Sequence, residues 1–118
     1  MPQITLEHST HFDKADFRKL ALEIHDLCVE HTGATLESCK TRIVRADNLV
    51  IADGSPDQAM VHCDVLILSG RTQEQKTALG EATLKAMVAA LTQYDGPRQI
   101  TVEVGDLDKP NYHKVTAG

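Results

Sequence analysis

The sequence predicts an α+β protein built as a two-layer sandwich, with two helices on one face of a four-stranded mixed sheet. Strand patterns and helix patterns follow one another in the order strand, helix, strand, and this order occurs twice along the chain. Right-handed crossovers in both β-α-β units would place both helices on the same face of the sheet. The other face would stay uncovered, which in a chain of 118 residues indicates that copies associate.

Length and composition fit one domain over residues 1–118. We expect the first β-α-β unit at about residues 2–46, a loop-rich hinge at about 47–58, the second unit at about 59–104 and an irregular tail at 105–118. The chain has no Trp, two Phe and two Tyr, so its core must consist of aliphatic side chains.

The first unit opens with a strand over Pro2–His8, in which Ile4 and Leu6 alternate with polar residues. Proline suits the first position of a strand because it has no N–H to donate. A helix follows, with Asp13 as the expected N-terminal cap and Gly33 as a left-handed C-terminal cap. Residues at helical spacing form its apolar face: Phe17, Leu20, Ala21, Ile24, Leu27, Cys28 and His31.

The pattern over Lys40–Arg45 predicts the second strand. The hinge contains turn residues on both sides of a short extended piece, Leu49–Ala52. The long apolar run Ala59–Ser69 is rich in β-branched residues, which is typical of an interior strand covered on both faces.

The second helix begins at Thr72, which together with Gln75 has the spacing of a capping box. Its apolar stripe consists of Leu79, Ala82, Ala86, Met87, Ala90 and Leu91. The helix ends before the turn residues 95–97, and alternating residues over Gln99–Val104 predict the last strand.

Charge and motifs exclude several functional classes. A net charge of −5 without a basic stripe argues against nucleic-acid binding. No apolar run is long enough to cross a membrane and no leader pattern is present, so we expect a cytoplasmic protein without a membrane partner. Cys28, Cys39 and Cys63 lack metal-type spacing, and His8 and His11 lack a third ligand, so neither a metal nor a cofactor is expected.

Pro2 is the candidate catalytic residue. If Met1 is removed, Pro2 becomes an N-terminal secondary amine held at the start of a strand. Such an amine titrates near neutrality, and neighbouring cations would favour its neutral, basic form. The alternative interpretation is an ordinary Met-Pro start that takes no part in chemistry.

Three cations are candidates for binding an anionic substrate. Lys40 and Arg42 lie two residues apart, and therefore on one face of the second strand, and Arg71 precedes the second helix. A helix N-terminus favours anions, and the planar guanidinium group suits a carboxylate, so a small-molecule carboxylate is the expected partner. The alternative is that these are solvated charges at a strand edge and in a loop.

Several segments together resemble the 5-carboxymethyl-2-hydroxymuconate isomerase family of the tautomerase superfamily. Individually they are short, and their joint order behind Met-Pro carries the resemblance. They are Met1–Ser9, Lys40–Val44, Ile51–Gly54, Val61–His62, Gly70–Thr72 and, more weakly, Asn111–Tyr112.

The resemblance implies a tautomerase-like homotrimer with sites between subunits and a cofactor-independent keto–enol isomerisation of 5-carboxymethyl-2-hydroxymuconate, from homoprotocatechuate breakdown, or a similar acid. By resemblance, Pro2 is the general base and acid, and Lys40, Arg42 and Arg71 bind substrate carboxylates. Lys40 replaces a family arginine, and the tail is shorter than is usual in the family. Two alternatives remain: a non-catalytic trimeric small-molecule-binding or structural protein that keeps Met1, and a related proline-base hydratase or dehalogenase.

Overall fold

The computed structural model covers residues 1–118. Four strands and two long helices follow one another as β1 (Gln3–Ser9), α1 (Phe17–Thr32), β2 (Lys40–Ala46), β3 (Ala59–Leu68), α2 (Gln73–Ala90) and β4 (Arg98–Leu107). Three single 3-10 turns lie between or after them, at Thr10–Phe12, Leu36–Ser38 and Lys109–Asn111.

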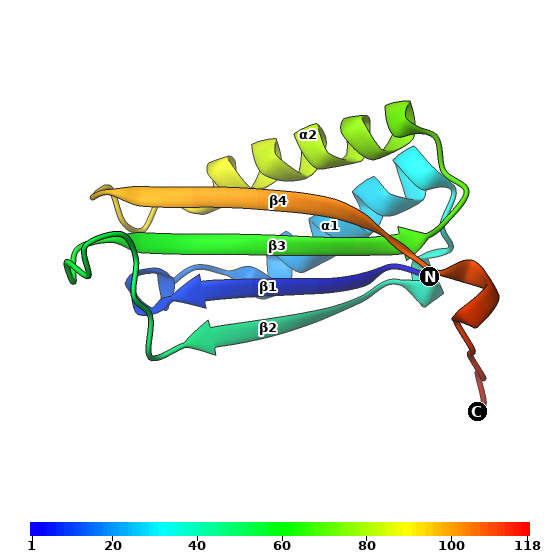
Figure 1. Cartoon of the computed structure of the whole chain (residues 1–118), viewed down its shortest axis with the longest axis horizontal. Helices are drawn as coiled ribbons and strands as arrows, with labels where there is room; N and C mark the ends of the chain where they lie inside the picture. Colours follow the sequence, from blue (N-terminus) through cyan, green and yellow to red (C-terminus); the bar gives the residue numbers. More distant parts are fainter.

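The four strands form one mixed sheet in the order β2-β1-β3-β4. Each β-α-β unit contributes a parallel pair, β1 with β2 and β3 with β4, and the two units meet where β1 and β3 run antiparallel. Both helices cover the same face of this sheet (Figure 1). The predicted fold class is confirmed.

The core lies between the sheet and the two helices. Alternate residues of β1 and β3, among them Ile4, Leu6 and Val65, are buried beneath apolar residues of both helices, such as Ile24 and Met87. Burial of these side chains is the main stabilising contribution of the fold, at roughly 1.5–3 kcal/mol for each large apolar residue.

The opposite face of the sheet has no second layer over it. In β3 the buried residues alternate with half-buried or exposed ones, so the expectation of an interior strand covered on both faces is wrong for the single chain. The open face is largely polar: Thr5 of β1 and Asp64 of β3 are paired across the sheet, and Glu103 follows on β4, although Leu66 of β3 is exposed on the same face. Central position in the sheet, rather than two covering layers, accounts for the apolar content of β3.

The N-terminal cap of α1 is Asp16 rather than Asp13. A carboxylate oxygen of Asp16 accepts a hydrogen bond from the Lys19 amide at 3.0 Å. The turn at Thr10–Phe12 delays the start of the helix, and Asp13 instead receives a hydrogen bond from Nε of Arg45 at 2.8 Å. The C-terminal cap is Gly33, as predicted, with φ of 70°.

The second helix begins as the sequence predicts, with a complete capping box between Thr72 and Gln75. Its stripe is confirmed at Leu79 and Met87, which are buried, but the fully buried Thr83 was not predicted. Thr83 is a polar residue between Ala82 and Leu84, and its type gives no sequence signal of burial.

The piece Leu49–Ala52 lies in the hinge and pairs with no strand. One other expectation is wrong. The last strand does not end at Val104 but continues to Leu107, because β4 stays in register with β3 up to the pair Leu68 and Leu107. Neither helix is long and apolar enough to span a bilayer.

Candidate active site at the amino terminus

The expected site residues meet at one end of the sheet. The parallel strands β1 and β2 both start there, and β3 and β4 both end there, so the topology gathers four chain segments at this edge. Figure 1 shows the amino terminus beside the end of β4, with the C-terminal tail descending past it. Pro2, Lys40, Arg71 and the tail after Leu107 therefore lie at the same edge.

Pro2 is fully buried and is held by the sheet. Its carbonyl oxygen accepts a hydrogen bond from the Lys40 amide at 3.3 Å, which fixes the start of β1 against the start of β2. Met1 precedes it and is partly buried.

The amino terminus lies in a cationic environment. Burial lowers the pKa of the Met1 terminal amine below its ordinary value, and the charges of Arg71 and Lys40 lower that pKa further. Lys114 in the tail acts in the same direction, and Cys39 opposes it. The neutral, proton-accepting form of an amine at this place is therefore favoured.

Arg71 is positioned by both β-α-β units. It follows Gly70, whose φ of 110° makes the turn out of β3, and it precedes the N-terminal cap of α2. Nε of Arg71 donates to the carbonyl oxygen of Thr32 at 3.2 Å. Thr32 is the last residue of α1, where carbonyl groups lack helical partners and the helix dipole is negative. The terminal nitrogens of the guanidinium group make no hydrogen bond within the chain, which leaves them available to a ligand.

The N-terminus of α2 contributes less to anion binding than its position suggests. The capping box engages the amides of Thr72 and Gln75 with side-chain oxygens of the same two residues. Arg71 is therefore the main candidate for anion binding at this turn, and the N-terminus of α2 contributes little.

Lys40 and Arg42 differ in their partners although both lie on β2. Nζ of Lys40 donates to the Ser38 carbonyl at 2.7 Å, and its charge acts on the terminal amine. Arg42 is exposed, and its Nη1 donates to Oε1 of Gln3 at 2.9 Å. Gln3 in turn donates through Nε2 to the Tyr112 hydroxyl at 2.9 Å. Arg42 thus connects β2, β1 and the tail, and it is not among the charges that act on the amine.

A hollow of about 520 Å³ opens at this edge. The strands contribute Gln3 and Lys40 to its lining, the turn before β2 contributes Glu37, and the rest comes from the tail: Tyr112, His113, Lys114, Val115, Thr116 and Ala117. Sequence reasoning missed this wall, apart from the weak signal at Asn111–Tyr112. An irregular polar tail has no periodicity from which a docking position could be predicted.

Two of the cysteines and the two histidines considered as metal ligands are buried or engaged in contacts within the chain. Burial raises the pKa of Cys28 and of Cys63 to about 12, so both thiols stay protonated near neutral pH. His8 stacks on Phe17 and its Nδ1 is hydrogen-bonded to the Ser9 carbonyl, whereas His11 lies between Ser9 and Pro56. These contacts do not bring the two imidazoles together as a ligand pair.

A different group of metal-ligand types lies on the open face of the sheet. Side-chain atoms of His62, Asp64 and Glu103 come within 4.8 Å of one another. These residues belong to two strands, β3 and β4, so no local sequence pattern indicates that they lie together. Both ring nitrogens of His62 already have partners in Thr101, at 2.6 Å, and Asp64, at 3.0 Å. His62 is therefore already hydrogen-bonded through both ring nitrogens and has none free to coordinate a metal.

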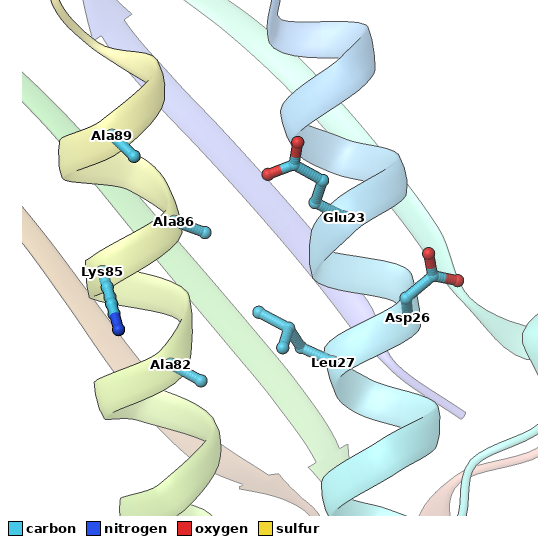
Figure 2. A pocket seen from close by; sticks show the side chains of 7 residues that line it. All are labelled: Glu23, Asp26, Leu27, Ala82, Lys85, Ala86 and Ala89. Atoms are coloured by element: carbon cyan, nitrogen blue, oxygen red, sulfur yellow. The ribbon is translucent and has the colours of Figure 1, made fainter.

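A second groove lies between the two helices, with a volume of about 480 Å³. Figure 2 shows Leu27 of α1 pointing toward Ala82 and Ala86 of α2, with the carboxylates of Glu23 and Asp26 on the α1 side. This groove shares no lining residue with the hollow at the amino terminus. It contains none of the predicted site residues.

The sequence of the chain matches that of a known protein family. The sequence model of 5-carboxymethyl-2-hydroxymuconate isomerase matches residues 2–115, which is nearly the whole chain. The chain belongs to the 5-carboxymethyl-2-hydroxymuconate isomerase family. Isomerase chemistry of the tautomerase type is therefore the activity class of its relatives. No curated protein sequence matches the chain significantly.

Solved structures show the same fold in this family and beyond it. A 5-carboxymethyl-2-hydroxymuconate isomerase from Deinococcus radiodurans R1 is 20% identical and superposes with a TM-score of 0.79, over 98% of this chain and 90% of that one. A fused 4-OT, described as a wild-type symmetric trimer, is 26% identical with a TM-score of 0.73, over 93% and 89% of the two chains. A macrophage migration inhibitory factor-like protein from Entamoeba histolytica is 18% identical with a TM-score of 0.68, over 97% and 95%.

Proposed function

We propose that the chain is a cofactor-independent keto–enol tautomerase of carboxylated 2-hydroxy dienoic acids, with 5-carboxymethyl-2-hydroxymuconate or a close analogue as substrate. Pro2, freed by removal of Met1, is the general base and then the general acid. The observation that carries the proposal is the amino terminus itself, which lies beside a hollow and among cations that lower its pKa.

The first step is removal of the enol proton. The neutral secondary amine of Pro2 takes the proton from the 2-hydroxyl group, and negative charge spreads over the conjugated dienolate. Arg71 and Lys40 hold the substrate carboxylate and stabilise this charge as it develops. The same two cations keep the free amine neutral before the reaction.

The second step returns the proton to carbon. The ammonium form of Pro2 donates to a distant carbon of the dienolate, which gives the α,β-unsaturated ketone and restores the neutral amine. One nitrogen serves both steps if the planar substrate lies across it. Atoms and charge balance without a metal or a second base.

The experiment combines intact mass with a tautomerisation assay. Mass measurement first separates chains with and without Met1, and both fractions are then assayed by ultraviolet absorbance with a 2-hydroxymuconate-type dienol. We expect activity only in the Met-free fraction. In that background, Pro2→Ala leaves a primary amine and should lower kcat/KM by at least about 10-fold.

Pro97→Ala is the matched control, because Pro97 is exposed before the start of β4, at the end of that strand opposite to Leu107 and the hollow. The proposal is wrong if the Met-retaining chain turns over at the same rate, or if both proline variants behave alike.

We also propose that the protein works as a homotrimer whose sites lie between subunits. The fused 4-OT relative is described as a symmetric trimer, and the open polar face of this sheet has no cover within the chain. Mass measurement by light scattering should give three copies per particle. A monomer with full activity would contradict this assembly.

Two alternative functions, one catalytic and one non-catalytic, have specific support. Glu37 lines the hollow beside Lys40, and a carboxylate there could activate water for hydration or dehalogenation of an unsaturated acid. A 3-haloacrylate assay with halide detection separates that chemistry from tautomerisation. The contact between Nζ of Lys114 and the Met1 sulfur, at 3.0 Å, favours a binding protein that keeps its methionine. Full retention of Met1 in the isolated protein would establish that alternative over the enzyme.

A further inference from the structure

The C-terminal tail forms one wall of the hollow at the amino terminus. Six consecutive residues, 112–117, line it together with Gln3, Glu37 and Lys40. The tail is attached through the hydrogen bond from Gln3 to the Tyr112 hydroxyl, and Gln3 is held in turn by Arg42. Groups on this wall therefore have a defined position relative to β1.

Lys114 is the positively charged group of this wall. Its Nζ lies 3.0 Å from the sulfur of Met1, which places the ammonium group beside the residue whose removal would free Pro2. Lys114 takes part in none of the salt bridges within the chain, although the protein has an excess of carboxylates. Loss of Met1 removes its one side-chain partner and leaves the ammonium group facing the space that the methionine occupied.

We infer that Lys114 is a specificity-determining residue of this site, which binds a second carboxylate of the substrate and so favours dicarboxylates over monocarboxylates. The expected effect on kinetics rests on the proposed function. The expected binding of a dicarboxylate by Lys114 does not.

The charges around the hollow support an anionic ligand with more than one carboxylate. Lys40 and Lys114 both line it, and Glu37 is the acidic residue of the lining. Arg71 adds a further positive charge at the terminal amine, so the surroundings as a whole are cationic. Arg71 and Lys40 account for one carboxylate, and Lys114, which comes from the tail, supplies a separate anchor for another.

A flexible lysine can contact a carboxylate without a fixed geometry. We therefore expect Lys114 to distinguish the number of carboxylates rather than the shape of the ligand.

The kinetic test compares Lys114→Gln with Lys109→Gln in the Met-free protein. Lys109 belongs to the same tail, carries the same charge and does not line the hollow, so it controls for the loss of one positive charge. The substrates are 2-hydroxymuconate, with two carboxylates, and 2-hydroxypenta-2,4-dienoate, with one. We expect Lys114→Gln to lower kcat/KM for the dicarboxylate roughly 10-fold, mainly through KM, and to change the monocarboxylate less than about 2-fold.

Lys114→Arg keeps the charge and should restore the preference for the dicarboxylate. Equal losses on both substrates, or equal effects of the Lys109 and Lys114 variants, would overturn the inference.

A binding measurement keeps the inference separate from the proposed reaction. Adipate and hexanoate are unreactive acids of equal chain length with two carboxylates and one. We expect the wild-type protein to bind adipate more tightly than hexanoate in an NMR titration, and Lys114→Gln to reduce this difference. If no dienol is turned over but adipate binding still depends on Lys114, the tautomerase proposal fails and the anchor stands. If turnover is normal and adipate binding is unchanged in Lys114→Gln, the anchor fails alone.

Discussion

Nε of Arg71 donates a hydrogen bond to the carbonyl oxygen of Thr32 at 3.2 Å. This contact joins the turn after β3 to the last residue of α1, so one guanidinium group is held by both β-α-β units. The negative end of the α1 dipole attracts the cation, and the terminal nitrogens of the guanidinium group have no hydrogen-bond partner within the chain. The helix end therefore determines the orientation of the residue that most strongly favours a neutral amine among the surrounding charges.

Arg71→Lys tests whether this orientation is needed. Lysine keeps the charge but has no Nε donor for the Thr32 carbonyl and no planar fork for a carboxylate. A charged hydrogen bond contributes about 1.5–3 kcal/mol, so we expect kcat/KM for a carboxylated dienol to fall about 10- to 100-fold. Arg98→Lys is the control, because Arg98 is exposed at the start of β4 and contacts only carbonyls of its own turn. Full activity in Arg71→Lys would mean that the charge alone is sufficient.

The pH dependence of catalysis follows from the cations at the amino terminus. Burial, Arg71 and Lys40 lower the pKa of the terminal amine. In the proposed mechanism the neutral Pro2 amine is the base, and the cations that lower the pKa of the Met1 amine would act on it too, so kcat/KM should rise with pH through a lowered pKa and then level off. Arg71→Gln and Lys40→Gln should each raise the amine pKa and move the rising limb to higher pH, with the larger shift for Arg71.

Two further groups act on the same amine. Lys114 also lowers its pKa, whereas the Cys39 thiolate would raise it. The pKa of Cys39 is itself raised, mainly by burial, so this thiol is protonated near neutral pH and adds no charge there. The profile is measured with the Met-free protein at constant ionic strength. A rising limb that stays in place in both variants would exclude the terminal amine as the titrating base.

Attachment of the tail depends on Tyr112. Tyr112→Phe removes the hydroxyl that accepts from Gln3, so the tail loses its side-chain link to β1. We expect faster amide hydrogen exchange over residues 111–117, with little change in β1. Tyr94→Phe is the matched control, because the Tyr94 hydroxyl donates to the Asp57 carbonyl at 2.6 Å and is outside the tail. Equal protection of the tail in both variants would show that other contacts hold it.

Periodicity and cap residues were sufficient to predict the fold. Alternation in β1, the apolar face of α1, Gly33 and the Thr72–Gln75 box all have local causes, and the structure confirms each of them. The cap of α1 was predicted at Asp13 and lies at Asp16, since both aspartates precede the apolar face of the helix. An ion pair with Arg45, which is distant in the sequence, decides that Asp13 is outside the helix.

Residues of the candidate site were predictable from the sequence only where both the residue type and its place at the end of an element indicated a role. Pro2, Lys40 and Arg71 stood out as a possible base and as cations near element ends, and the sheet topology brings these three to one edge. The network from Arg42 through Gln3 to Tyr112 joins residues more than 100 positions apart, and no local pattern indicates it. For the same reason the sequence did not reveal Lys114 as a neighbour of the amino terminus.

The buried hydroxyl of Thr83 should destabilise the protein. Thr83 lies in α2 and is fully buried, and its Oγ1 has no hydrogen-bond partner. Valine has nearly the same shape without the hydroxyl, so Thr83→Val should raise the free energy of unfolding by about 1–2 kcal/mol. Thr77→Val makes the same substitution at an exposed position of the same helix and should change it by less than about 0.5 kcal/mol. Urea unfolding at one chain concentration measures both, since association also affects the midpoint. A loss of stability in Thr83→Val alone would mean that its hydroxyl makes a hydrogen bond in the folded protein.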